Sequence, residues 1–301
     1  MDIDRRTLLG SGLALTLAGC AHETGRPGAE ASATSEALAA IERRAGGRLG
    51  AYILDPVSGR GAGWRADDRF AQCSAFKLSL AAMMLAGAER GQIDLAETLR
   101  WTEADLLSHS PVTRPATATG LTVEALARGT LVTSDNPAAN ILLRRFGGPE
   151  ALTRFWRSIG DTTSRLDRYE PALNEVPPGT SLDTTTPRAM AQTAAALLLG
   201  PTLSPAGREK LKGWMRETAT GLDRLRAGFP TGWDAGDKTG TWTDPERRIY
   251  VDVAFGGPAG AVPVIVAAYH ETWAPFAVGS GASAGVLAEV GRLAVGVVGR
   301  R

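Results

Sequence analysis

A serine and a lysine three residues apart form the first pair in this sequence that could do chemistry, in Ser74-Ala75-Phe76-Lys77. They open an apolar segment rich in Met and Ala, which predicts a buried helix over 74–90. Unpaired N–H groups at a helix N-terminus stabilise a developing negative charge, and the spacing places Lys77 on the same face as Ser74. Ser74 could therefore be a nucleophile and Lys77 its base, although an N-cap serine followed by a surface lysine explains these residues equally well.

The scarcity of lysine gives this pair more weight. Of the 33 basic residues, four are lysines (Lys77, Lys210, Lys212 and Lys238) and 29 are arginines. A buried lysine can lose its proton and act as a base, whereas arginine cannot. A lysine at position 77 therefore suits a chemical role.

Two more motifs follow in order, Ser134-Asp135-Asn136 and Lys238-Thr239-Gly240. Each alone has an ordinary explanation, the first as helix-capping residues and the second as an exposed lysine on an edge strand. Together with the first motif they form the S-x-x-K, S-D-N and K-T-G set of class A β-lactamases and penicillin-binding proteins.

Few residues in this sequence could support other catalytic mechanisms. His22, His109 and His270 are the only histidines, and neither a zinc-binding spacing nor a Ser-His-Asp motif is present. Phosphate-binding glycine loops are also missing, and a net charge of +1 gives no reason to expect nucleic acid as a partner. We therefore expect no metal and no cofactor, and a catalytic base that is a lysine or a carboxylate.

A fourth motif separates the two related families. Residues 165–174 read RLDRYEPALN, and residues 182–187 read LDTTTP. They resemble the start and end of the omega loop (165–183) of class A β-lactamases, including its E-x-x-L-N core at Glu170 and Asn174. Arg168 and Asp183 match the ion pair that closes this loop, and we expect an exposed pair that positions Glu170 rather than stabilises the fold. The resemblance covers roughly residues 36–299.

The resemblance implies catalytic roles for the matching residues. Ser74 is the nucleophile that opens the β-lactam ring, and Lys77 is the base or a proton relay in this acylation. Ser134 passes a proton to the departing lactam nitrogen. Glu170, helped by Asn174, holds and activates the water that hydrolyses the acyl-enzyme.

Substrate-binding roles carry over in the same way. Asn136 hydrogen-bonds the amide side chain of the substrate, and the backbone N–H groups of Ser74 and Thr241 form the oxyanion hole. The substrate carboxylate is bound along residues 238–241, which are Lys238, Thr239, Gly240 and Thr241.

Three positions depart from the family pattern. The arginine that assists carboxylate binding has two candidates: Arg224 resembles the one that family members carry just before this strand, and Arg247 could serve as the one on the next strand. We favour Arg224, although residues 242–248 align poorly. His109 stands where the family usually has an aromatic residue at the site entrance. Cys73 adjoins the nucleophile, but Trp242 occupies the position of its disulfide partner in some carbapenem-hydrolysing relatives. We expect Cys73 to be a free thiol that takes no part in catalysis. Because the disulfide cannot form, one argument for carbapenem hydrolysis is removed.

The elements that must position these residues come from both ends of the chain. Strands are predicted near 50–55, 61–65, 233–241, 249–255 and 262–269, with helices between the second and third and at 285–298. This order predicts one antiparallel sheet flanked by helices, with an inserted all-helical domain and the active site between them. The predicted boundaries are 36–68 and 219–301 for the α/β domain and 69–218 for the helical domain.

The first 35 residues read as an export region. Arg5-Arg6 precedes an apolar run that ends at Leu17-Ala18-Gly19-Cys20, which resembles a twin-arginine signal with a lipoprotein processing site. Residues 1–20 are predicted to be a signal peptide, with Cys20 lipidated and residues 21–35 a flexible tether. Simple cleavage nearby is the alternative. We expect an exported monomer in the periplasm or cell envelope, anchored to the membrane where Cys20 is lipidated.

Two other functions compete with β-lactam hydrolysis. A penicillin-binding D-Ala-D-Ala peptidase shares the first three motifs but stops at a long-lived acyl-enzyme, and the Glu170 loop argues against it. An envelope protein that binds β-lactams without turnover would not need Ser74, Lys77, Ser134 and Glu170 together.

Overall fold

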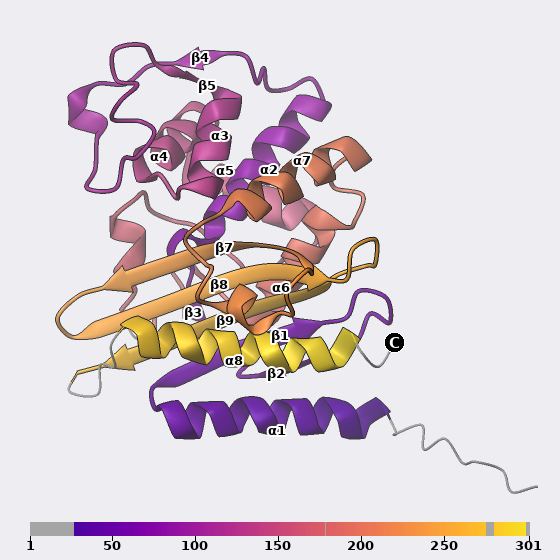
Figure 1. The fold of residues 1–301 in the computed structure, drawn as a ribbon. Helices are drawn as coiled ribbons and strands as arrows, with labels where there is room; N and C mark the ends of the chain where they lie inside the picture. Colours follow the sequence, from indigo (N-terminus) through magenta and orange to yellow (C-terminus); the bar gives the residue numbers. More distant parts are fainter. Residues whose placement is uncertain (1–26, 178, 275–279, 299–301) are drawn as a thin grey trace, which may run out of the picture.

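The computed structural model describes residues 27–177, 179–274 and 280–298, and its centre is a five-stranded antiparallel sheet (Figure 1). The strand order is β2-β1-β9-β8-β7, so strands from the two ends of the chain meet at the β1–β9 pair. The strands are β1 (Arg48–Leu54), β2 (Gly61–Trp64), β7 (Asp234–Thr243), β8 (Arg247–Gly257) and β9 (Val264–Trp273). This arrangement confirms the fold class predicted from the sequence.

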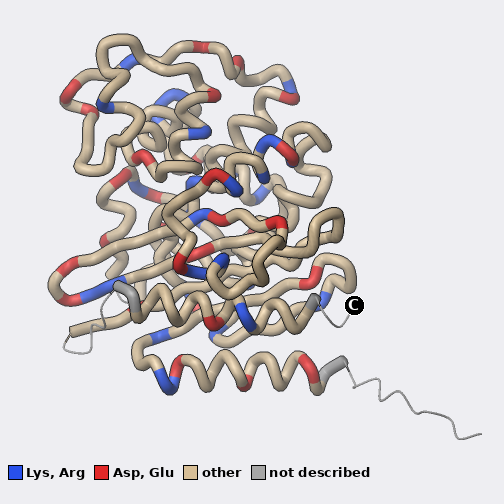
Figure 2. The backbone as a smooth tube through the Cα atoms, viewed as in Figure 1, with Lys and Arg blue, Asp and Glu red and all other residues tan. Residues whose placement is uncertain are grey.

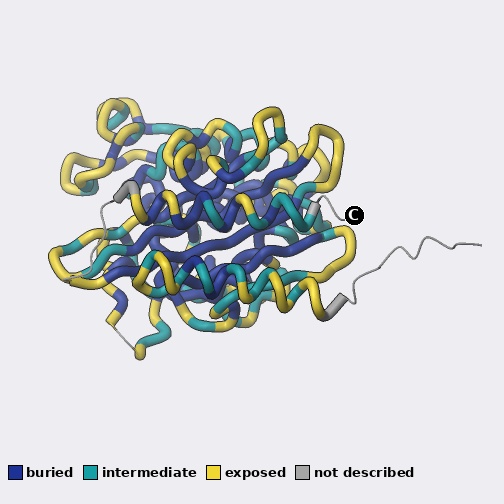
Figure 3. The backbone as a smooth tube through the Cα atoms, turned by 60° about the horizontal axis from the view of Figure 1, so that its bottom comes forward, coloured by how far each residue is buried: buried dark blue, intermediate teal, exposed yellow. Residues whose placement is uncertain are grey.

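Both faces of the sheet are covered, which explains why β1, β8 and β9 are apolar along most of their length. Alternate residues of β8 face opposite sides, so Tyr250 and Ala254 join one core cluster while Val251 and Phe255 join another. The first cluster lies under α1 (Pro27–Ala45) and α8 (Ser280–Val298). Figure 3 shows the strands buried between this pair of helices and the rest of the molecule.

The larger core joins the other face of the sheet to the helices between β2 and β7. At its centre is α2 (Phe76–Glu89), which is mostly apolar and buried on all sides from Phe76 to Gly87, as expected for an interior helix. The remaining helices are α3 (Val123–Val132), α4 (Asn136–Arg145), α5 (Gly148–Ser158), α6 (Pro187–Leu198) and α7 (Pro205–Glu217). Figure 2 shows acidic and basic residues interspersed over the whole fold.

Short elements connect these helices and carry several site residues. Four single turns of 3-10 helix are η1 (Cys73–Ala75), η2 (Glu103–Asp105), η3 (Ala172–Asn174) and η4 (Leu225–Gly228). Two small sheets pair β3 (Phe70–Ala71) with β6 (Thr184–Thr185) and β4 (Thr98–Leu99) with β5 (Leu121–Thr122). The β3–β6 pair brings the end of the omega loop beside the segment that leads to Ser74.

The first helix begins inside the segment predicted to be a tether. Residues 21–35 were expected to be a tether, but α1 starts at Pro27, so residues 27–35 are helical. Three of the nine residues there are Ala, which favours helix, and Pro is accepted in the first turn. Residues 21–26 and the predicted signal peptide lie outside the described residues. The boundaries of the helical domain at 69 and 218 stay a prediction.

Candidate active site

Ser74 lies in η1, directly before α2. Strand β7 packs closely against this turn. Cys73 has φ +42°, in the left-handed region that is costly for a side chain with Cβ. A Cβ at Gly240 would lie 2.9 Å from Cys73 Cβ and 3.0 Å from Ser74 N. Glycine at position 240 therefore allows the strand of the K-T-G motif to lie against the nucleophile.

Lys77 is fully buried and joins three of the four motifs. Its Nζ lies 3.0 Å from Ser74 Oγ, 3.1 Å from Glu170 Oε1 and 3.0 Å from the carbonyl oxygen of Ser134. It also donates to Asn136 Oδ1. Burial lowers the pKa of Lys77, while the charge of Glu170 opposes this shift. The alternative of a surface lysine is therefore wrong.

The S-D-N motif divides its work between capping and the site. Asp135 is the N-cap of α4 and accepts a hydrogen bond from Ala138 N at 2.8 Å, and it also binds the backbone N–H groups of residues 112 and 113. The capping explanation thus applies to the aspartate. Ser134, with φ +59°, and Asn136 on either side of it turn toward Lys77.

Lys238 approaches the same serine from the edge strand of the sheet. Its Nζ donates to Ser134 Oγ at 3.1 Å and to the carbonyl oxygen of Thr239 at 2.6 Å. Thr239 Oγ1 in turn lies 2.7 Å from Thr220 Oγ1. Burial lowers the pKa of Lys238 to about 7, and the positive charge of Lys77 contributes. The side chain is fully buried, so the alternative of an exposed edge-strand lysine is also wrong.

Glu170 enters the site from the omega loop and is held by two asparagines. Asn174 Nδ2 donates to Glu170 Oε2 at 2.7 Å, and Ser74 Oγ lies 3.5 Å from Glu170 Oε1. The side chain of Asn140 binds the backbone of Glu170 on both sides, accepting from its N–H at 3.0 Å and donating to its carbonyl at 2.9 Å. Sequence reasoning missed Asn140, although a polar residue within the apolar face of α4 was a usable signal.

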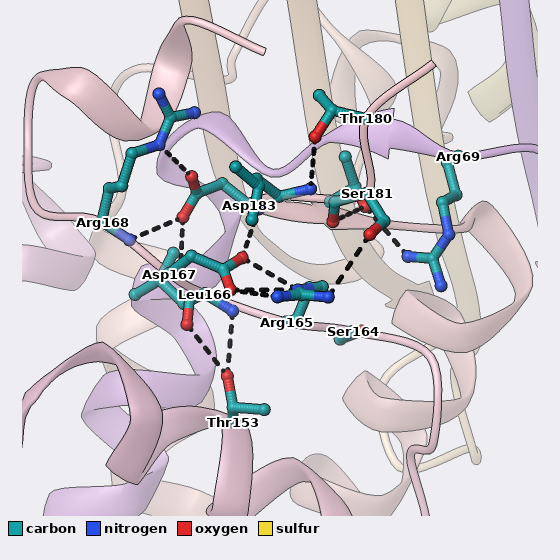
Figure 4. A network of polar contacts seen from close by, with 12 residues as sticks. Arg69, Thr153, Ser164, Arg165, Leu166, Asp167, Arg168, Thr180, Ser181 and Asp183 are labelled. Atoms are coloured by element: carbon teal, nitrogen blue, oxygen red, sulfur yellow. Dashed lines mark hydrogen bonds and ion pairs between the residues drawn. The ribbon is translucent and has the colours of Figure 1, made fainter. Parts of the chain in front are cut away.

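The neck of the omega loop is a network of polar contacts around the buried Asp183 (Figure 4). Arg168 Nε lies 2.6 Å from Asp183 Oδ2, and Asp183 Oδ1 accepts from the backbone N–H groups of Asp167 and Arg168. Asp167 pairs with Arg165 and accepts from Asp183 N–H. The side chain of Asp183 is 0% exposed. The predicted pair forms, but the expectation that it is exposed is wrong, because the loop folds back over the carboxylate.

The two candidate arginines lie in different places. Arg224 is buried behind β7 and donates to Thr241 Oγ1 at 2.7 Å and to the carbonyl oxygen of Gly240 at 2.9 Å. Arg247 instead donates to the carbonyl oxygen of Val176 and to Glu271. Only Arg224 therefore reaches the strand that carries the K-T-G motif.

His109 lies at the rim of this group. Its side chain is exposed, and its Nε2 lies 2.8 Å from the carbonyl oxygen of Thr133. Its own carbonyl accepts from Asn136 N–H at 3.1 Å. The position beside the S-D-N motif agrees with a residue at the site entrance.

Cys73 is buried and free, and burial raises the pKa of its thiol. His270 lies away from the site, between Ser283 Oγ and the carbonyl oxygen of Gly46. Among residues 27–177, 179–274 and 280–298, no group of His, Cys, Asp and Glu side chains could hold a metal ion.

Known proteins are similar to this chain in sequence and in fold. Residues 33–296 match the model of the β-lactamase enzyme family. β-Lactamase L2 of Stenotrophomonas maltophilia is 44% identical over 263 residues, 87% of this chain and 85% of the relative. The carbapenem-hydrolysing β-lactamase KPC of Klebsiella oxytoca is 39% identical over 273 residues, 89% of each chain. The structure of a class A β-lactamase representing the last common ancestor of Gram-negative bacteria superposes with a TM-score of 0.83 at 46% identity, covering 88% of this chain and 99% of that one.

Proposed function

Because this chain belongs to the class A β-lactamase family, we propose that it hydrolyses the β-lactam amide through an acyl-enzyme on Ser74 and a water activated by Glu170. Family membership carries the activity itself: the protein is a β-lactamase that hydrolyses β-lactams and confers resistance to them. The division of labour among its residues is the part proposed here. Its strongest support is the position of Lys77 Nζ, 3.0 Å from the nucleophile and 3.1 Å from the loop carboxylate.

Acylation uses the contacts around Lys77. Ser74 Oγ attacks the lactam carbonyl carbon, and its proton passes to Lys77 directly or through Lys77 as a relay to Glu170. The carbon–nitrogen bond breaks as Ser134 delivers a proton to the departing nitrogen. Ser134 Oγ can recover that proton from Lys77, whose Nζ lies 3.5 Å away, while Lys238 Nζ, at 3.1 Å, keeps its own proton.

Substrate binding uses β7. We assign the substrate carboxylate to Lys238, Thr239 and Arg224, because the guanidinium of Arg224 reaches Thr241 Oγ1 on this strand. The backbone N–H groups of Ser74 and Thr241 receive the oxyanion, an assignment supported by the packing of β7 against Ser74 at Gly240. Asn136 and the exposed His109 flank the space left for the substrate's side chain.

Deacylation uses the omega loop. A water beside Glu170 loses a proton to the carboxylate and attacks the ester carbonyl, and Ser74 Oγ leaves with a proton. Asn174, 2.7 Å from Glu170 Oε2, fixes the carboxylate for this step. A penicillin-binding peptidase has no use for this second carboxylate, so the buried Glu170 favours the hydrolase.

Replacing Glu170 with Ala separates the two half-reactions. Ser74 should still attack, at least slowly, while the ester persists because its general base is gone. Intact mass should show the protein plus one benzylpenicillin, and steady turnover should fall by about 10²–10⁴-fold. Turnover of Glu170→Ala at the wild-type rate would contradict the assignment.

The N-terminal region carries a separate proposal about location. We propose that the protein is exported and anchored to the membrane through a lipid on Cys20, on the strength of Arg5-Arg6 and Leu17-Ala18-Gly19-Cys20. In the part of the chain that the structure describes, no helix is long and apolar enough to cross a bilayer.

A further inference from the structure

Arg247 is the residue whose place the proposed chemistry leaves unexplained. Its Nη1 donates to the carbonyl oxygen of Val176 at 2.7 Å, and its Nη2 lies 2.8 Å from Glu271 Oε1. Val176 follows η3 at the end of the segment that carries Asn174, and Val176 N–H donates to the carbonyl oxygen of Asn174 at 3.0 Å. One guanidinium thus joins the sheet to the backbone that holds the proposed partner of Glu170.

The partner of Arg247 on the sheet is itself fixed. The Glu271 side chain is 1% exposed, and its second oxygen accepts from Arg48 Nη1 at 3.1 Å. Strand register places Trp242, Ile249, Glu271 and Arg48 in one row across β7, β8, β9 and β1. A carboxylate buried between two arginines on a central strand is a rigid anchor.

The turn between β7 and β8 presents Arg247 to the loop. Asp244 Oδ1 accepts from the N–H groups of Glu246 and Arg247 at 2.8 and 2.7 Å, and Asp244 Oδ2 accepts from Trp242 Nε1 at 3.0 Å. Trp242 packs against the core beside this turn. Residues 242–248, which align poorly with the family, therefore form an ordered end of the β7–β8 hairpin. Arg247, the first residue of β8, reaches the omega loop from there.

Two arginines, each paired with a buried carboxylate, hold the end of the omega loop. Arg168, paired with the buried Asp183, donates to the carbonyl oxygen of Glu175 at 2.9 Å. Arg247, paired with the buried Glu271, donates to the next carbonyl, that of Val176. The first arginine ties the loop to its own neck, and the second ties it to the sheet.

We propose that Arg247 is a positioning residue for deacylation, holding the Asn174–Val176 segment so that Asn174 keeps Glu170 oriented toward the hydrolytic water. This inference rests on the proposed roles of Glu170 and Asn174. Arg247 itself touches neither the substrate nor the reacting atoms. Its loss therefore acts on the step that needs the loop carboxylate and spares attack by Ser74.

The test compares Arg247→Met and Arg247→Lys with wild type. Lys keeps a positive charge beside Glu271, which protects the fold, but it lacks the planar fork that reaches two acceptors at once. We expect deacylation of the benzylpenicillin ester to slow by about 10–100-fold in Arg247→Met, since small displacements of reacting groups have effects of this size. Arg247→Lys should show a smaller shift in the same direction.

The diagnostic readout is the balance between the two half-reactions. With deacylation limiting, kcat and KM should fall together while kcat/KM stays near wild type, and quenched samples should accumulate the ester by intact mass. A role in stability alone would lower the melting temperature or the burst amplitude without changing this balance. A fall in kcat/KM without ester accumulation, or unchanged constants in both variants, overturns the proposal.

Two control variants distinguish the possible failures. Arg145→Ala removes a surface arginine that pairs with Glu97 at the far end of α4, and its kinetics should match wild type. Glu170→Ala in the same assay reports on the proposed function. If Glu170→Ala accumulates ester and the Arg247 variants do not, only the role of Arg247 fails; if Glu170→Ala does not, the assignment of Glu170 fails first.

Discussion

At the scale of single residues, two buried lysines flank one serine. Ser134 Oγ lies between Lys77 Nζ and Lys238 Nζ, and burial lowers the pKa of both amines. The two roles make opposite demands on the proton. Lys77 must be able to accept a proton from Ser74, whereas Lys238 must keep its proton to attract the substrate carboxylate.

This opposition predicts a pH effect that belongs to Lys238. Its pKa of about 7 means that the charged form is lost as pH rises through neutrality. We expect kcat/KM for benzylpenicillin, which reports on the free enzyme, to fall above about pH 7 through this group. Lys238→Arg keeps its charge at every accessible pH, so its profile should lack the alkaline fall. Rates measured from pH 5 to 10 check this, and identical profiles in the two proteins would rule it out.

The residue types of the site were predictable, but the contacts between its distant segments were not. Motif order alone pointed to Ser74, Lys77, Ser134 and Lys238, because each offers a distinct functional group at a fixed spacing. The polar Asn140 within the apolar face of α4 was an unusual position, but the sequence could not show that its amide would bind both backbone groups of Glu170. That contact depends on two segments 30 residues apart meeting in space.

At the scale of elements, the omega loop is held as part of the core. Its end at Asp183 adjoins β6, which pairs with β3, and Gln72 N–H donates to the carbonyl oxygen of Asp183 at 2.9 Å. The loop neck and the approach to Ser74 therefore share hydrogen bonds. A disturbance at the neck reaches both the nucleophile and the loop carboxylate.

Removing Arg168 should therefore affect stability as well as rate. Arg168→Ser leaves the Asp183 carboxylate buried with two backbone N–H donors but no countercharge, at a cost of about 1–3 kcal/mol. Urea unfolding followed by circular dichroism measures this cost. Arg188→Ala is the matched control, because its pair with Asp67 is exposed and should contribute no more than about 1 kcal/mol. Equal losses in the two variants would show that burial of Asp183 does not matter.

The elements themselves were predicted unevenly. Helices and strands in the middle of the chain matched their periodic patterns, because buried faces need a regular apolar repeat. The start of α1 did not, since residues 27–35 are small and polar with few apolar positions. There the helix continues from a part anchored by Leu38 and Ile41 against the sheet, a tertiary effect that composition does not reveal.

At the scale of the whole molecule, the site lies where the sheet edge, α2 and the omega loop meet. The sheet supplies Lys238 and Thr241 from β7, and the helical region supplies Ser74, Ser134 and Glu170. The order of strands and helices in the sequence predicted this arrangement. When the strands of one sheet come from both ends of a chain, the helical middle of the chain has to pack on a face of that sheet.

The location of the whole molecule depends on Cys20. Mass spectrometry of the protein isolated from its own cells should find Cys20 as a lipid-modified N-terminus, and Cys20→Ser should release the enzyme from the membrane fraction with its kinetics unchanged. A native N-terminus elsewhere without lipid would remove the anchor and leave export standing.

The β1–β9 pair has a consequence for how the chain acquires its structure. β9 is the middle strand of the sheet, yet it is the last of these five strands to leave the ribosome. Arg48 of β1 pairs in register with Glu271 of β9 and precedes it by more than two hundred residues. Contacts that span so much chain form late, because a long loop must close before they contribute. During synthesis the β1–β2 hairpin thus waits with the other edge of β1 unpaired, and α2 is made long before the β7 segment that packs against η1. The nucleophile can acquire its surroundings only when the last strands arrive, so catalytic competence is tied to the final stage of folding.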